Sequence, residues 1–157
     1  MLRISKLTDY ATVILAHLPD AGQGRCTATE VASSAGLALP TVSKVLKELQ
    51  RAGLVASTRG AHGGYALGRP AAQITAADII DAVEGPVALT ECASHDNHCG
   101  LESSCRVGAS WQRVSVAIRA ALAQVTLTQL TGTAPLADRP LHLNVGAVAP
   151  IVWRARA

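Results

Sequence analysis

The chain has 157 residues, which allows one compact domain with a small appended element and excludes two full-sized domains. Hydrophobic residues make up 49% of the chain but aromatic residues only 3%, so the core must consist mainly of Ala, Val, Leu and Ile, as in helix-rich proteins. The net charge of +3 is unevenly spread, because residues 1–70 carry eight Lys and Arg against four Asp and Glu, and residues 71–157 carry six against seven. The basic first half therefore suits a nucleic-acid-binding module.

No segment of the sequence suggests export or membrane insertion. The longest nearly uncharged apolar stretch, residues 145–153, is well short of the roughly 20 residues that a membrane helix needs. The basic start of the chain is not followed by a long apolar run. We therefore expect a cytoplasmic protein with no membrane partner.

The first half of the chain has the pattern of a helix-turn-helix. Apolar residues recur at steps of three and four over residues 6–18, which predicts a first helix. Thr27 and Glu30 have capping-box spacing at the start of a second helix, and Gly36 suits its left-handed end. A third amphipathic helix is predicted between Pro40 and Gly53. Two short helices around a glycine turn are typical of DNA-binding modules.

The polar face of the predicted third helix carries hydroxyl groups near its start and cations along its length. Its polar residues are Thr41, Ser43, Lys44, Lys47, Gln50 and Arg51. We expect Thr41, Ser43 and Lys44 to face base edges, and Lys47 and Arg51 to contact phosphates. The alternative is an ordinary amphipathic helix with a solvated face.

A short hairpin is predicted directly after the third helix. Residues 54–57 and 65–67 read as strands, and the connection between them is rich in glycine. Glycine lets the loop backbone approach a phosphate or a narrow groove closely, and Arg59 supplies positive charge there. We therefore expect a wing that contacts DNA through Arg59, His62 and Gly63.

These motifs resemble those of the Rrf-type regulators typified by IscR, NsrR and RirA. The resemblance rests on residues 5–11, the Gly53-Leu54-Val55 helix exit and residues 59–65, and it extends over residues 1 to about 130. Residues 78–91, with their Glu84-Gly85-Pro86 break, most resemble the regulators of SUF iron–sulfur assembly operons. The resemblance implies a dimeric winged-helix repressor or activator whose two recognition helices engage half-sites about one helical turn apart.

Three cysteines follow a fourth predicted helix, which Thr75 and Asp78 cap and Gly85 ends. Cys92, Cys99 and Cys105 have C-x6-C-x5-C spacing, too wide for the paired C-x2-C of most zinc ribbons. Three thiolates can hold an iron–sulfur cluster and leave one position for another ligand. The residues alone leave a cluster and zinc as equal alternatives, and the family resemblance favours the cluster, of either the 2Fe-2S or the 4Fe-4S type.

The fourth cluster ligand has several candidates. Cys26 precedes the second helix, far from the cysteine trio in sequence, and is interpreted as a bystander thiol. The loop residues His95, Asp96, His98 and Glu102 are polar enough to be there for solubility alone. IscR-like members have a histidine shortly after the third cysteine, which residues 106–111 lack. Asp9 is our choice, because in nitric-oxide-sensing relatives an aspartate in this first-helix context reaches the cluster across the dimer; the alternative is a carboxylate favoured by the helix dipole.

The last predicted helix covers residues 107–130. Its apolar residues recur at alternating steps of four and three, namely Val107, Trp111, Val114, Ile118, Ala121, Leu122 and Val125. Such a seam suits a homodimer, although packing within one chain would give the same periodicity. Residues 131–157 form a tail to which we assign no role.

The sequence thus predicts a mainly α fold with a small β wing: a winged helix-turn-helix over residues 1–85, a cysteine loop over 86–106 and a dimerisation helix over 107–130. The predicted function is a DNA-binding transcription regulator that senses iron–sulfur status and controls assembly genes. Zinc or thiol oxidation at the cysteines, or an electron-carrying iron–sulfur protein, are the alternatives. No nucleophile–base pair or phosphate-binding loop suggests an enzyme.

Overall fold

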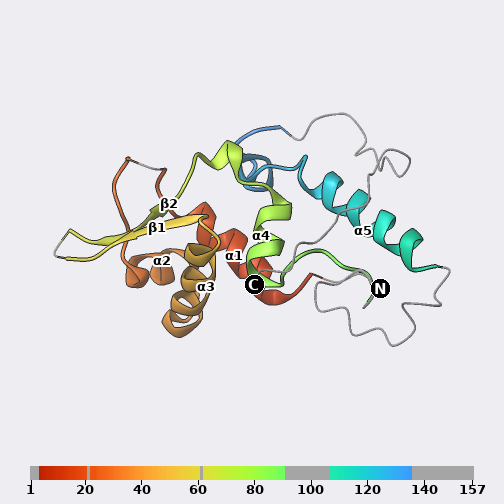
Figure 1. Cartoon of the computed structure of the whole chain (residues 1–157). Helices are drawn as coiled ribbons and strands as arrows, with labels where there is room; N and C mark the ends of the chain where they lie inside the picture. The colour runs from red at the N-terminus through yellow and green to blue at the C-terminus, as the bar shows by residue number, and fades with distance from the viewer. Residues whose placement is uncertain (1–3, 21, 61, 91–106, 136–157) are drawn as a thin grey trace.

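The computed structural model describes residues 4–20, 22–60, 62–90 and 107–135. The described chain is mainly helical with one antiparallel two-stranded sheet, which confirms the predicted fold class. In chain order the elements are α1 (Lys6–Ala16), α2 (Ala28–Ala35), α3 (Leu39–Arg51), β1 (Val55–Thr58), β2 (Gly64–Leu67), the 3-10 helix η1 (Ala71–Gln73), α4 (Ala76–Val83), α5 (Gly108–Leu122) and α6 (Leu127–Leu130). The β1–β2 hairpin reaches out on one side of the molecule, and α5 lies on the opposite side (Figure 1).

Local capping signals fix the helix ends where the sequence predicts them. Thr27 and Glu30 form a complete capping box at the start of α2, and Gly36 ends the helix with a φ of 65°. Thr75 and Asp78 form the same box at the start of α4. Each box satisfies backbone N–H groups that the first turn of a helix leaves without partners.

The core lies where α1, α2, α3 and α4 meet beneath the hairpin. Its members are aliphatic, as the composition predicts, and the largest fully buried ones are Ile14, Leu15, Val31, Val42, Val45, Leu46, Leu49, Leu54, Ile74, Ile79 and Leu127. These side chains come from α1 to α4, from α6 and from the segments beside the hairpin and η1, so these elements share one hydrophobic core to which α5 adds no residue.

The wing strands pair in register with Val55 opposite Leu67 and Thr58 opposite Gly64. A third short segment adds to their edge, because Cys26 and Tyr65 form an isolated antiparallel bridge. This bridge connects the wing to the loop between α1 and α2.

The structure differs from the sequence prediction in the region 107–130, where two helices replace one. Helix α5 ends at Leu122, and Thr126 with Gln129 forms a capping box that starts α6. The backbone around Thr126 pairs with the segment before α4: Ala76 N–H donates to Val125 O at 2.8 Å, and Leu127 N–H donates to Ile74 O at 2.7 Å. These bonds and the burial of Leu127 turn the chain back into its own domain, which breaks the helix.

Two polar connections join α4 to its neighbours. Arg119 on α5 donates from Nε and Nη2 to Asp81 Oδ2 at 2.9 and 2.6 Å. Three residues further along, just past the C-terminal end of α4, the Glu84 carboxylate accepts hydrogen bonds from Ser5 N–H and from the Thr8 hydroxyl. Helix α4 therefore links the first turn of α1 to α5.

Among the described helices, none is long and apolar enough to cross a membrane.

Candidate nucleic-acid interface

Helix α3 has one fully buried face and one exposed polar face. The buried face consists of Val42, Val45, Leu46 and Leu49, each with no exposed surface. Ser43, Lys44, Lys47 and Arg51 are all exposed on the other side, whereas Thr41 is half-buried. Because α3 is held by its apolar side, its cations and the Ser43 hydroxyl are available to a partner molecule. Of the third-helix residues that the sequence predicts for DNA contact, all but Thr41 are thus exposed on α3.

The cations of α3 differ in whether they form an ion pair within the chain. Arg51 Nη1 lies 3.0 Å from Glu48 Oε2, and the Arg51 side chain keeps 61% of its surface exposed. Such an exposed ion pair is weak and easily exchanged for a phosphate. Lys44 and Lys47 have no ion-pair partner within the described residues. The two lysines therefore present uncompensated charge.

The wing presents Arg59 and His62, both exposed, next to a tightly closed turn. Gly63 N–H donates to Gly60 O at 2.9 Å. A Cβ atom on Gly63 would lie 2.5 Å from Thr58 O, so only glycine fits at this position. The glycine that the sequence suggested for close approach to DNA is required by the wing itself.

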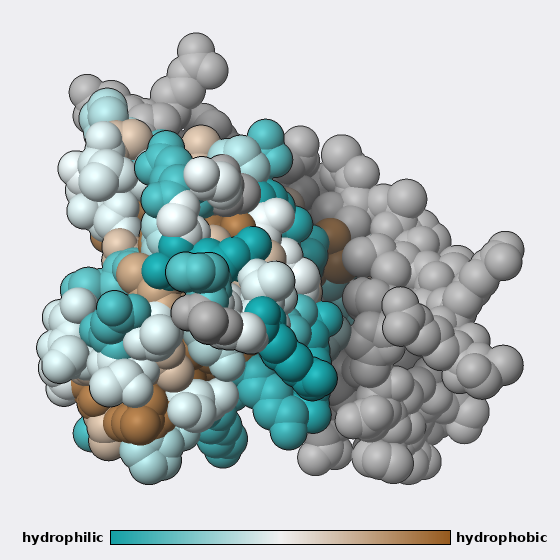
Figure 2. All heavy atoms as spheres, turned by 90° about the vertical axis from the view of Figure 1, so that its left-hand side faces the viewer, coloured by the Kyte–Doolittle hydropathy of each residue, from teal (hydrophilic) through white to brown (hydrophobic). Residues whose placement is uncertain are grey.

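The face formed by the wing, α2 and α3 is largely polar. Figure 2 looks onto this end of the molecule, and most of its described surface is hydrophilic or neutral, with only small apolar patches. Leu39, at the start of α3, is one exposed apolar residue of the described chain, with 43% of its surface accessible. A polar, cationic face with a protruding wing matches the chemistry of a nucleic-acid backbone.

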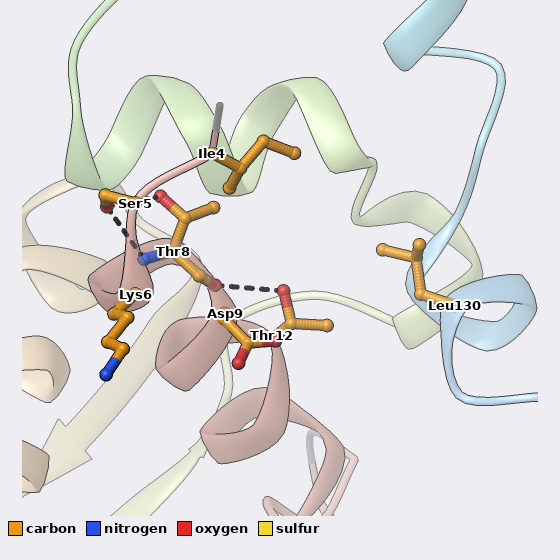
Figure 3. Close-up of a pocket in the computed structure, with 7 residues that line it drawn as sticks. All are labelled: Ile4, Ser5, Lys6, Thr8, Asp9, Thr12 and Leu130. Carbon is orange, nitrogen blue, oxygen red and sulfur yellow. Dashed lines mark hydrogen bonds between the residues drawn. The ribbon is translucent and has the colours of Figure 1, made fainter. Parts of the chain in front are cut away.

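Asp9 lies away from this face, in a hollow between α1 and α6. Figure 3 shows that the hollow is bordered by Asp9 and Thr12 on α1, with Ile4 and Leu130 facing each other across it. Within the described chain, the Asp9 side chain is exposed and makes no hydrogen bond or ion pair. The carboxylate is therefore free to bind a ligand or a partner.

Comparison with known proteins identifies the family. Residues 4–133 match the Rrf2 family, described as iron-dependent transcriptional regulators. The chain belongs to the Rrf2 family. The family is one of DNA-binding transcription regulators and not of enzymes, which confirms the predicted regulatory role and the winged-helix reading of α2, α3 and the hairpin.

Individual proteins resemble this chain over most of their length. It is 32% identical over 135 residues to Protein aau3 of Rhizobium meliloti (strain 1021), covering 85% of this chain and 88% of the relative. The structure of CymR, the global cysteine regulator of B. subtilis, is similar with a TM-score of 0.61 and 30% identity, over 85% of this chain and 99% of CymR. The structure of T. potens IscR is similar with a TM-score of 0.56 and 27% identity, over 88% and 94% of the two chains.

The predicted cluster ligands of this Rrf2 chain are not all within the described residues. Cys92, Cys99 and Cys105 lie outside them, as do His95, His98 and Glu102. Within the described ranges, no three His, Cys, Asp or Glu side chains gather as a metal site would require. Of the predicted ligands, the structure therefore positions only Asp9.

Sequence reasoning missed one exposed cation beside the wing of this Rrf2 chain. Arg25 lies in the loop between α1 and α2 and is exposed beside the wing residues His62 and Gly63. Its charge is visible in the sequence, but its position is not. The Cys26–Tyr65 bridge that holds it there joins residues almost forty positions apart, and local patterns do not reveal such a contact.

Proposed function

We propose that this Rrf2 regulator is a cytoplasmic homodimer that binds operator DNA, senses iron–sulfur status through a cluster held by its cysteines, and controls iron–sulfur assembly genes. The observation that carries the DNA part is the exposed row of Ser43, Lys44 and Lys47 on α3, opposite a fully buried face and next to the wing. A cytoplasmic location follows from this proposal, because the protein must reach the chromosome.

The DNA contacts are assigned by position on α3 and the wing. Thr41, Ser43 and Lys44, in the first turns of α3, read base edges, as the early residues of recognition helices do. Lys47 and Arg51, further along, bind phosphates together with Arg59 and His62 of the wing. The backbone at Gly63, which has no side chain of its own, approaches the duplex at the tip of the wing.

Replacing single side chains separates the two kinds of contact. Lys47→Ala and Arg59→Ala should weaken binding to all duplexes, and each should reduce the magnitude of the negative slope of log K against log salt by about 0.9. Ser43→Ala should instead change the base preference at one position, with the salt slope unchanged. Fluorescence anisotropy with operator and scrambled duplexes measures both. Unaltered slopes in both cation variants would contradict the assignment.

The cysteine trio and Asp9 form a donor set that fits an iron–sulfur cluster. Thiolates are the preferred ligands of cluster iron, and three of them leave one position for another donor. Cys92, Cys99 and Cys105 would hold the cluster, and the free carboxylate of Asp9 would occupy the fourth position. A bound cluster supplies iron that can be lost or can react with oxidants and nitric oxide, which is the chemistry that a sensor needs.

The position of Asp9 couples the proposed cluster site to DNA binding. Asp9 lies in the first turn of α1, and the buried residues Ala11, Ile14 and Leu15 of this helix pack in the core with α3. A carboxylate is a hard ligand and binds such iron weakly, so Asp9 would hold the position closed but release it easily. Binding and release at Asp9 would then bias the placement of α1, and with it that of the recognition helix.

Anaerobic purification tests the cluster. We expect a coloured protein with iron and sulfide in equal amounts, and loss of the visible absorbance in Cys92→Ser, Cys99→Ser and Cys105→Ser. Cys26→Ser is the matched control and should keep the absorbance, because Cys26 lies in the wing bridge. Zinc without sulfide in the wild-type protein would refute the cluster.

The Asp9 assignment has its own test. Anaerobically reconstituted Asp9→Ala should lose its cluster absorbance in air faster than wild type, whereas His95→Ala and His98→Ala should not. If Asp9→Ala behaves as wild type and one histidine variant loses its cluster faster, the fourth ligand lies in the cysteine loop.

Thiol-based sensing is a second candidate, because CymR, the global cysteine regulator, is among the structures similar to this chain. In that case the same cysteines would respond by oxidation, without bound iron. A colourless wild-type protein whose DNA affinity falls on mild oxidation and recovers with a thiol reductant would favour this function.

The homodimer is proposed to use the apolar residues of α5. Val107 and Trp111 expose 56% and 43% of their surface, and Val114 and Ile118 are only half-buried in the single chain. Burying a charge in this seam without compensation would be costly, so Ile118→Glu should give a monomer. Sedimentation that finds the variant as a dimer of normal stability would show that α5 packs only within its own chain.

A further inference from the structure

The loop between α1 and α2 lies against the wing. Cys26 N–H donates to Tyr65 O at 2.9 Å, and Tyr65 N–H donates to Cys26 O at 2.8 Å. The packing is close, since a Cβ atom on Gly64 would lie 2.9 Å from Cys26 O and 3.1 Å from the Arg25 Cβ. Arg25 is thereby held next to the wing, and Thr27 is placed at the start of α2.

A surface hollow, here called the wing-side hollow, lies between this loop, the start of α2 and the wing turn. It is lined by Arg25, Thr27, Glu30, His62 and glycines of the loop and wing. Arg25 and His62 are exposed and enter the hollow from two different segments. In the described part of the chain, neither side chain has an ion-pair partner.

The chemistry of the wing-side hollow suits a phosphate. A guanidinium group binds phosphate oxygens through parallel N–H donors, and an imidazole N–H adds a donor from the other side. Glycines around the hollow leave room for a sugar–phosphate backbone to come close. A duplex that touches both α3 and the wing must also carry its backbone past the surface between them, and α2 begins on that surface.

We propose that Arg25, together with His62, binds a phosphate of the operator backbone in the wing-side hollow, so that the α1–α2 loop contacts DNA in addition to α3 and the wing. This inference rests on the proposed use of α3 and the wing in DNA binding. It adds a residue that neither the helix-turn-helix pattern nor the wing motif includes.

Removing the charge of Glu30 should have the opposite effect on DNA binding to removing the charge of Arg25. Glu30 Oε2 accepts hydrogen bonds from Thr27 N–H at 2.7 Å and from the Thr27 hydroxyl at 2.9 Å. The bond from the Thr27 backbone lowers the pKa of Glu30, so the carboxylate is charged at neutral pH. A negative charge on the rim of the hollow opposes a bound phosphate. Glu30→Gln removes that charge, and glutamine can still serve in a capping box.

The experiment measures binding of the full-length protein to a mixed-sequence duplex of about 30 base pairs between 50 and 200 mM salt. Arg25→Ala should reduce the magnitude of the negative salt slope by about 0.9, so its affinity deficit relative to wild type should shrink about 3.5-fold as the salt rises across this range. His62→Ala should weaken binding in the same direction, and Glu30→Gln should strengthen it. Arg113→Ala is the matched control, because it removes the same charge from an exposed position on α5.

The outcomes separate this inference from the proposed function. If Lys47→Ala reduces the magnitude of the salt slope while Arg25→Ala behaves as Arg113→Ala, the wing-side hollow does not bind phosphate, but the assignment of α3 to DNA binding stands. If neither Lys47→Ala nor Arg59→Ala changes the slope, the proposed DNA contacts are themselves wrong. Unchanged or weaker binding by Glu30→Gln, with an unchanged melting temperature, would also overturn the inference.

Discussion

The substitution Leu127→Ala tests whether α6 is part of the winged-helix core. The Leu127 side chain is 2% exposed and packs in the core, and the Leu127 N–H donates to Ile74 O at 2.7 Å. Leu127→Ala should therefore leave a cavity and cost about 3 kcal/mol of unfolding free energy, within the usual range of about 2–5 for a buried leucine. For a domain of this size, that loss corresponds to a melting temperature lower by roughly 6–12 °C.

Leu130→Ala is the matched control, because Leu130 lies one turn further along α6 and keeps 44% of its surface exposed. It removes the same atoms and should cost much less. Thermal and urea unfolding would compare both variants with wild type at one protein concentration, since dimerisation would make stability concentration-dependent. Equal, small losses in the two variants would show that α6 does not contribute to the core, and the reasoning from burial would fail.

Three further predictions concern polar contacts and the wing. The hydrogen bond from the Thr8 hydroxyl holds the pKa of Glu84 below its ordinary value of 4.5. Glu84→Gln should therefore have a lower free energy of unfolding than wild type above that pH, and the difference should disappear as the pH falls below it. A difference that does not vary with pH would contradict the bond. A double-mutant cycle of Asp81→Asn and Arg119→Gln should give a coupling of about 0.5–1 kcal/mol, because the Arg119 side chain is 43% exposed, and zero coupling would mean that the pair contributes nothing in solution. Gly63→Ala should weaken DNA binding with little change in melting temperature, because it distorts only the exposed wing turn, and wild-type affinity would show that the wing is not needed.

Much of the predicted interface follows from local rules. The apolar positions of α3 recur with helical spacing, so the face that carries Ser43, Lys44 and Lys47 had to point away from the core. The capping boxes at Thr27 and Thr75 bring together residues three apart, and such contacts depend on sequence alone. The division of α5 from α6 had a local signal as well, since Thr126 and Gln129 have the same spacing, but the continuing apolar periodicity obscured it.

The amino-acid sequence by itself determined the first four helices, the capped starts of α2 and α4 and the outer face of α3, because helical hydrogen bonds and caps join residues three or four positions apart. Only the tertiary structure decided that Arg25 lies beside the wing, that Glu84 receives a hydrogen bond from Thr8, and that Leu127 returns to the core. These contacts join distant segments, and each depends on how the whole core closes. A charge or a carboxylate in the sequence shows which chemistry is available, whereas its neighbours are set by the packing of elements that no local pattern specifies.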